Sequence, residues 1–165
     1  MRIGIPKEQK KNETRVALIP VSIPKLTKLG FDVVIEKGAG ENSGYLDSEY
    51  EDKGAKISNL EDVMGSELIA SIDIPDIKLM KKGQMLACMA DPFRNLKETK
   101  KIINAGVTLL SLEVIPRRLS KGQSMDVNSS QDNLSGYRAA LMGSQHIAKM
   151  VPMMMTSAGT VRPAK

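Results

Sequence analysis

Short apolar runs alternate with segments of helical periodicity along most of the chain. Runs of aliphatic and β-branched residues predict strands, whereas apolar residues spaced three or four apart predict helices. The predicted strands are 2–6, 31–36, 55–57, 67–72, 83–89 and 107–112, and the predicted helices are 22–29, 47–54, 60–64 and 95–105. This alternation predicts an α/β fold, a three-layer, mostly parallel sheet with helices on both faces.

The pattern changes after Pro116. Residues 116–128 are rich in Arg, Ser, Gly and Gln and are predicted to form a loop. Ser129, with Asp132 three residues later, resembles a capping box, and the spacing of Leu134, Tyr137 and the apolar residues that follow predicts a long helix ending before Pro152. We therefore expect an N-terminal α/β domain at 1–128. Residues 129–165 are expected to form a long helix and linker toward a second domain that is absent from the chain.

Composition narrows the function classes. Aromatic residues make up 3% of the chain and Trp is absent, which argues against a stacking platform for nucleic acid. The net charge of +5 comes from scattered Lys and Arg, which is typical of a solvated surface, so no nucleic-acid partner is expected. No apolar stretch approaches the roughly 18 residues that span a membrane. The chain reads as a strand from its first residues, so no signal or transit peptide is expected.

Two single residues limit the chemistry further. Cys88 is the one cysteine, which excludes an intramolecular disulfide and fits a reducing compartment. It lies in an apolar run, so a buried, inert thiol is favoured over a nucleophile. His146 is the one histidine, so neither a histidine-based metal site nor a Ser-His-Asp triad is expected.

A glycine-rich segment follows the second predicted strand. Gly38, Gly40 and Gly44 suggest a dinucleotide-binding turn, but the G-x-G-x-x-G pattern requires the third glycine one residue earlier and at the start of a helix. An ordinary loop in which glycine permits the turns is therefore the favoured interpretation.

The most specific pattern lies near the N-terminus. Arg15 ends a polar loop and could hold a carboxylate with two hydrogen bonds, or could form a surface ion pair with Glu8 or Glu13. Composition alone describes a strand, a polar loop and a capped helix here. The pattern consists of Gly4-Ile5-Pro6-Lys7-Glu8, Asn12-Glu13-Thr14-Arg15-Val16-Ala17-Leu18, Pro20 and Leu26-Thr27-Lys28-Leu29-Gly30.

This string resembles the N-terminal signature shared by alanine dehydrogenases and the NAD(H)-binding alpha subunits of proton-translocating NAD(P) transhydrogenases. A second block resembles the transhydrogenase branch of that family in particular. That block comprises Arg118-Leu119-Ser120-Lys121-Gly122-Gln123-Ser124-Met125-Asp126, Ser129-Ser130-Gln131, Asn133-Leu134, Gly136-Tyr137-Arg138-Ala139, Met153-Met154-Met155-Thr156, Ala158-Gly159-Thr160-Val161 and Pro163-Ala164.

The resemblance implies an activity and a set of partners. The complete enzyme would transfer a hydride from NADH to NADP⁺, coupled to proton translocation. NAD(H) would bind to this subunit, and NADP(H) to a partner component. A membrane subunit and a homodimer are also implied, with a cytoplasmic location peripheral to the inner membrane. The absent second domain would be the dinucleotide-binding domain, and this chain alone is expected to be inactive.

The resemblance also implies where the cofactor binds. Gln123, Arg118 and Asp126 correspond to residues that act at the nicotinamide, and Leu119, Ser120 and Ser129 complete the cofactor-binding set. The residues themselves agree in kind, because Arg118 is a fork of donors and Gln123 offers both a donor and an acceptor. Asp126 could hold Arg118 in place. Counting from Pro116 selects Arg117 instead of Arg118. The alternative interpretation is a solvated loop with Ser129 as a helix cap.

Two further function classes remain open. An alanine dehydrogenase-like enzyme would require a His near 85–91 and a Lys near Pro75, and neither residue is present there. The other class is a non-catalytic fragment or assembly module, which the missing G-x-G-x-x-G supports for this chain taken alone.

Overall fold

A computed structural model of the protein describes residues 1–116 and 118–163. The chain forms two compact units, Met1–Ile115 and Pro116–Lys165, called unit 1 and unit 2.

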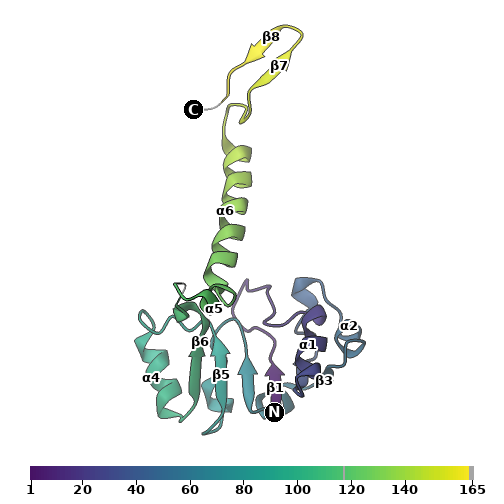
Figure 1. Ribbon diagram of the computed structural model, residues 1–165, viewed down its shortest axis with the longest axis vertical. Helices are drawn as coiled ribbons and strands as arrows, with labels where there is room; N and C mark the ends of the chain where they lie inside the picture. Colours follow the sequence, from purple (N-terminus) through teal and green to yellow (C-terminus); the bar gives the residue numbers. More distant parts are fainter. Residues whose placement is uncertain (117, 164–165) are drawn as a thin grey trace. The chain divides into compact units, whose positions relative to one another are not determined.

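Unit 1 is built on a six-stranded sheet. Its strands are β1 (Arg2–Ile5), β2 (Asp32–Glu36), β3 (Lys56–Ser58), β4 (Leu68–Ala70), β5 (Met85–Cys88) and β6 (Thr108–Ser111). Their order in the sheet is β3-β2-β1-β4-β5-β6, and every neighbouring pair is parallel (Figure 1). The predicted α/β class and the parallel sheet are confirmed.

Short helices connect the strands. They are α1 (Ile23–Lys28), α2 (Asp47–Glu51), α3 (Leu60–Met64) and α4 (Leu96–Asn104), with 3-10 turns η1 (Pro20–Ser22), η2 (Glu41–Ser43), η3 (Ile77–Leu79) and η4 (Leu112–Val114). Helix α3 begins where the sequence predicts, because the Asn59 side chain accepts a hydrogen bond from the Asp62 amide and so caps the first turn. In α1, Pro24 lies in the first turn, where a missing N–H costs little.

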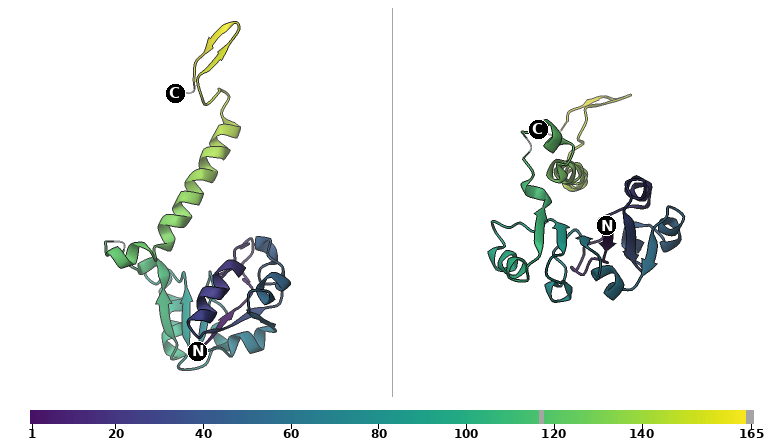
Figure 2. Two further views of the ribbon diagram at one scale, coloured as in Figure 1. Left: turned by 45° about the vertical axis from the view of Figure 1, so that its right-hand side comes forward. Right: turned by 60° about the horizontal axis from the view of Figure 1, so that its bottom comes forward.

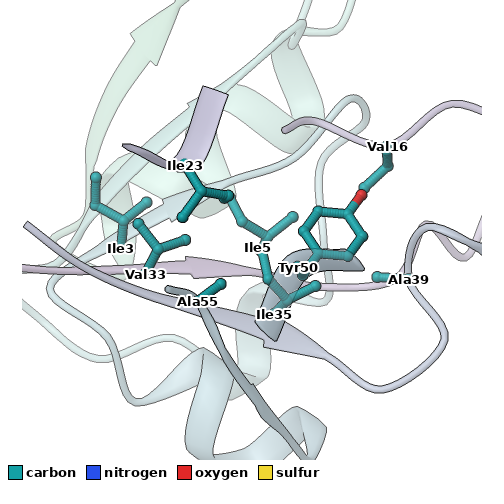
Figure 3. Close-up of a cluster of buried hydrophobic side chains, with 9 residues drawn as sticks. All are labelled: Ile3, Ile5, Val16, Ile23, Val33, Ile35, Ala39, Tyr50 and Ala55. Atoms are coloured by element: carbon teal, nitrogen blue, oxygen red, sulfur yellow. The ribbon is translucent and has the colours of Figure 1, made fainter. Parts of the chain in front are cut away.

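Two apolar cores lie on opposite faces of this sheet. The first packs Ile5 and Ile35 of the sheet against Ile23 of α1 and Tyr50 of α2 (Figure 3). The second packs β4 and β5 against α3 and α4, through residues that include Ile69, Leu86, Met64 and Ile102. The right-hand view of Figure 2 shows helices above and below the strands of unit 1. Tyr50 is the one aromatic residue among the buried hydrophobic residues of unit 1, in line with the aromatic-poor composition.

Unit 2 contains helices α5 (Ser120–Gln123) and α6 (Val127–His146) and a hairpin of β7 (Met154–Thr156) and β8 (Gly159–Val161). The prediction of a loop across 116–128 is therefore wrong in part, since α5 and the start of α6 lie there. Within the predicted linker that follows the long helix, Met154–Thr156 pairs antiparallel with Gly159–Val161, so this part is a hairpin instead of the expected loop.

The long helix has different ends from those predicted. Asp126 is the N-cap, and its carboxylate accepts a hydrogen bond from the Ser129 amide, so Ser129 lies inside the first turn instead of capping it. A carboxylate at this end also interacts favourably with the helix dipole. The helix ends at His146, because Ile147 adopts an extended conformation with ψ of 133°. In the described part of the chain, the helices are too short or too polar for a membrane crossing.

Candidate functional site

The strand order of unit 1 reverses between β1 and β4. In open parallel sheets, the connections at such a switch point leave in opposite directions and open a crevice beyond the carboxyl ends of the strands. The segments that follow β1 and β4 supply charged side chains to this place. These are Glu8, Lys10, Glu13 and Arg15 after β1, and Asp73 after β4. We call these five residues the switch-point cluster.

Glu8 ties the two segments together across the switch point. Its carboxylate accepts hydrogen bonds from the backbone N–H groups of Ile72 at 2.5 Å and Asp73 at 3.2 Å. Burial raises the pKa of Glu8, against the lowering effect of those two hydrogen bonds, and the carboxylates of Asp73 and Glu13 raise it further. The Glu8 carboxylate therefore occupies two backbone N–H donors at the switch point.

Both cations of the cluster are paired. Lys10 Nζ lies 2.9 Å from Asp73 Oδ1, and this hydrogen bond raises the pKa of Lys10. Arg15 forms a bidentate pair with Glu13, with Nε to Oε1 at 2.8 Å and Nη2 to Oε2 at 2.7 Å. The guanidinium lowers the pKa of Glu13 to about 2. Of the alternatives for Arg15, the structure therefore forms the ion pair with Glu13.

The sequence alone does not assemble this cluster. Arg15, Glu13 and Glu8 stand out in the N-terminal pattern, but the pairing of Lys10 with Asp73 depends on β1 and β4 being neighbours. The sequence offers one signal for this pair, which is that Lys10 and Asp73 each closely follow the carboxyl end of a predicted strand. Chemically, the cluster is a network of two cations and three carboxylates in which each cation is paired with a carboxylate and the third carboxylate, Glu8, accepts from backbone amides.

Cys88 ends strand β5 and is fully buried. Burial, with a smaller effect of the Glu113 carboxylate, raises the pKa of its thiol to about 12. The thiol therefore stays protonated at neutral pH, as expected for an inert buried cysteine.

The glycine-rich segment packs against the core. A Cβ on Gly40 would lie 2.7 Å from Tyr50 Cε2 and 2.9 Å from the Tyr45 carbonyl oxygen, so only glycine fits there. Gly38 has φ of +72° and its amide donates to Asp47 Oδ1. These contacts explain the glycines by packing and turn geometry, in line with the loop interpretation.

The segment predicted to contact the nicotinamide lies in unit 2. Four residues of the segment are exposed: Arg118, Leu119, Ser120 and Gln123. The backbone N–H of Gln123 donates a hydrogen bond to the Leu119 carbonyl at 3.0 Å, which forms the turn of α5. Arg117, the alternative arginine, lies outside the described residues. The exposed guanidinium of Arg118 and amide of Gln123 present donors suited to a carboxamide or phosphate.

Asp126 and Ser129 meet at the start of α6. The Asp126 carboxylate accepts from the Ser129 amide at 3.1 Å and from the Ser129 hydroxyl. The serine hydroxyl is therefore already engaged, and the two residues form a helix cap. The predicted hold of Asp126 on Arg118 stays a prediction.

Other candidate sites in the structure lie elsewhere. A cavity of about 520 Å³ is lined by residues of α3 and η3 and by Lys81, and none of the predicted site residues contributes to it. No group of metal-ligating side chains occurs among the residues that the structure describes. His146 is the last residue of α6.

These features define a class of protein before they define a family. Unit 1 is a doubly wound parallel α/β domain with a switch point between β1 and β4. The chain belongs to the alanine dehydrogenase/PNT family, since the model of its N-terminal domain matches residues 4–135. The resemblance in the sequence is thereby confirmed.

The curated relatives favour one branch of that family. An NAD(P) transhydrogenase subunit alpha protein of Rhodospirillum rubrum is 36% identical over 175 residues, a match that spans all of this chain and 45% of the relative. The corresponding protein of Rickettsia prowazekii is also 36% identical, over the same shares of the two chains. An alanine dehydrogenase of Mycolicibacterium smegmatis is 29% identical over 90% of this chain. The chain thus spans about half the length of the relatives it matches.

Solved structures show the same preference. A transhydrogenase from Sinorhizobium meliloti superposes with a TM-score of 0.91 at 39% identity, covering 99% of this chain and 50% of that one. An L-alanine dehydrogenase superposes with a TM-score of 0.69 at 30% identity, covering 73% of this chain and 34% of that one.

Proposed function

We propose that this chain is the N-terminal part of the NAD(H)-binding alpha subunit of a proton-translocating NAD(P) transhydrogenase. The observation that carries the proposal is the match to a transhydrogenase over 99% of the chain at a TM-score of 0.91. The alanine dehydrogenase match covers 73% of the chain at a lower score.

The switch-point cluster supports this choice over amino-acid oxidation. An alanine dehydrogenase must bind a substrate carboxylate and move a proton. Here Arg15 holds Glu13 and Lys10 holds Asp73, so a substrate carboxylate would have to displace an internal one. The sequence also lacks a histidine in the segment 85–91 that ends β5.

Hydride transfer between two nicotinamides makes lighter demands on the protein. The C4 hydrogen of NADH leaves with its electron pair and joins C4 of NADP⁺, giving NAD⁺ and NADPH, so no protein acid or base is required. What the protein must supply is approach geometry and electrostatics. We assign Arg118 and Gln123 to that task because both present exposed donors on the α5 segment. Asp126 and Ser129 position the segment by capping α6.

The partners follow from the same proposal. The complete enzyme would include an NADP(H)-binding component and a membrane subunit, with this subunit peripheral to the membrane on its cytoplasmic side. A homodimer is part of the proposal, since α6 exposes Leu134, Tyr137 and Leu141 along its middle turns.

The direct test is reconstitution. This chain, joined to the part of the Rhodospirillum rubrum relative that lies beyond the match, is mixed with an NADP(H)-binding component. We expect NADPH to form at the expense of NADH, and no reduction of NAD⁺ by alanine. Alanine-dependent reduction of NAD⁺ would instead establish the dehydrogenase alternative.

The chain alone provides a second test. We expect it to bind NADH weakly, because the glycine turn and helix N-terminus that hold a pyrophosphate are absent from it. A dissociation constant in the low micromolar range, equivalent to roughly 7–8 kcal/mol, would contradict this expectation.

A further inference from the structure

The cavity beside α3 has no part in the candidate functional site. It measures about 520 Å³, within the range of roughly 300–1,000 Å³ that small-molecule sites occupy. Two of its lining residues, Gly65 and Lys81, shortly precede strands β4 and β5. The cavity therefore lies toward the amino ends of these strands, whereas the switch-point cluster follows the carboxyl ends of β1 and β4. All of its lining residues belong to unit 1.

Three apolar side chains line this cavity. Leu60 and Met64 come from α3, where a spacing of four residues places them on the same side of the helix. Leu79 comes from η3 and is 45% exposed, whereas Met80 beside it is buried in the second core. A large apolar side chain that lines a concave site and stays outside the core is available to the hydrocarbon part of a ligand.

One buried side chain ties the two walls of the cavity together. Gln84 is 7% exposed, and its Nε2 donates hydrogen bonds to the carbonyls of Met64 at 2.7 Å and Ser66 at 2.6 Å. Its Oε1 accepts a hydrogen bond from the backbone N–H of Lys81. The end of α3 and the segment that carries Lys81 are therefore held at a fixed spacing. A ligand that enters a preformed cavity pays little for ordering the protein around it.

Two lysines of the lining supply unpaired positive charge. Among the residues that the structure describes, the side chains of Lys78 and Lys81 form no ion pair. The backbone of Lys78 is fixed, because its N–H donates to Asp76 Oδ1 at 3.0 Å. Glu61 is the acidic residue of the lining, and it lies in the first turn of α3, where the helix dipole stabilises a carboxylate. Two cations and one carboxylate leave one excess positive charge.

We propose that this cavity binds a medium-chain fatty carboxylate. The hydrocarbon chain lies against Leu60, Met64 and Leu79, and the carboxylate pairs with Lys78 and Lys81. One excess positive charge favours a monoanion over a phosphate dianion, and a concave cavity favours a free molecule over a flat membrane surface. None of the residues assigned to the cofactor lines this cavity, so the proposal does not rest on the proposed function.

Titration with decanoate tests the proposal, with the isotope-labelled methionine methyls of the full chain followed by NMR. Met64 lines the cavity at 2% exposure, and Met155 in β7 is 81% exposed and reports non-specific adsorption. The volume-conserving change Met64→Leu identifies the Met64 signal. We expect a saturable shift of that signal with a dissociation constant on the order of 0.1 mM or lower. No shift of Met64 up to about 1 mM, or a shift of Met155 alone, would overturn the proposal.

The two lysines give the charge test. Lys78→Gln combined with Lys81→Gln should weaken decanoate binding by about tenfold or more, because charge-assisted contacts to the carboxylate are lost. Lys97→Gln combined with Lys100→Gln on α4 is the matched control, since both lysines are exposed and the net charge changes equally. Unchanged affinity in the first double variant, or an equal loss in both, would overturn the proposal. So would decanol or decylamine binding as tightly as decanoate, because recognition would then be apolar alone or directed to Glu61.

Leu79→Ser gives the apolar test. It should weaken decanoate binding by about fivefold or more, because the hydrocarbon chain loses apolar contact area. Leu79 is 45% exposed, so the melting temperature should fall by no more than about 2 °C, which separates lost binding from unfolding. Leu29→Ser, at a leucine that is 73% exposed after α1, is the control and should leave binding unchanged. Unchanged binding in Leu79→Ser would overturn the proposal, as would binding to vesicles of phosphatidylglycerol without binding of decanoate.

Discussion

Tyr50 attaches to the core the loop after β1, which carries four of the five residues of the switch-point cluster. The residue is 0% exposed and lies among the aliphatic side chains of the first core (Figure 3). Its hydroxyl donates a hydrogen bond to the Leu18 carbonyl at 3.0 Å. Leu18 ends the segment that contains Glu13 and Arg15. Burial raises the pKa of Tyr50 to about 12, so the hydroxyl remains a donor at any pH at which the protein would be studied.

Tyr50→Phe removes that donor and keeps the ring. The part-buried Leu18 carbonyl then lacks its partner, which costs about 0.5–1.5 kcal/mol. For a domain of roughly a hundred residues, about 1 kcal/mol lowers the melting temperature by about 4 °C. The expected drop is therefore about 2–6 °C. Tyr50→Ala also removes the ring and should cost still more, about 3–5 kcal/mol.

Urea and thermal unfolding, followed by circular dichroism, measure the effect. Tyr45→Phe is the matched control, because Tyr45 lies edge-on to Tyr50 at 6.4 Å between ring centroids and is only half-buried. It should change the unfolding free energy by less than about 0.5 kcal/mol. Equal stability of Tyr50→Phe and wild type would refute the reasoning, as would equal losses for the two tyrosines.

Two further predictions concern charge and catalysis. The lowered pKa of Glu13 stabilises the fold above the ordinary carboxyl range, so this contribution should be lost as pH falls from about 5 toward about 2. Glu13→Gln should flatten that part of the stability profile, whereas the exposed pair partner Glu98→Gln should leave it unchanged. In this chain joined to the remaining part of the Rhodospirillum rubrum relative, Gln123→Asn should slow single-turnover hydride transfer at nearly unchanged NADH affinity, and Arg118→Ala should reduce both the rate and the affinity. A normal hydride-transfer rate for Gln123→Asn would reject the role assigned to Gln123. If Arg117→Ala lowers the rate and Arg118→Ala does not, the functional arginine is Arg117, the residue selected by counting from Pro116.

The strands and helices of unit 1 are largely predictable because their signals are local and agree with one another. Helix α3 has the predicted bounds, since Asn59 caps it and Gly65 follows it. The predicted strand 83–89 contains β5, which the structure limits to Met85–Cys88. The two differ only at their ends.

Unit 2 is harder to predict because its signals compete. Asp126 and Ser129 are both good N-caps three residues apart, and periodicity alone does not choose between them. Gly122 disfavours a helix, so the local sequence predicts a loop where α5 lies. The run Met153-Met154-Met155 lacks the alternation of a half-buried strand, and its turn lacks the Asn-Gly signal of hairpins, so nothing local predicts β7 and β8.

The candidate site is predictable as a set of residues but not as a set of contacts. Family resemblance selects Arg118, Gln123 and Asp126, and their roles remain predictions. The Lys10–Asp73 pair joins residues 63 positions apart, which only the strand order brings together.

The seam between β1 and β4 has a consequence for local unfolding. The two strands pair at two register positions, Ile3 with Leu68 and Gly4 with Ile69. The first core has its sheet residues mainly in β1 and β2, and the second has them in β4 and β5. Such an arrangement favours two cooperative blocks that open separately in hydrogen exchange. Glu8 belongs to one block and holds the amides of Ile72 and Asp73 in the other. Those two amides lie outside any strand, so their exchange rates report directly on when the blocks part.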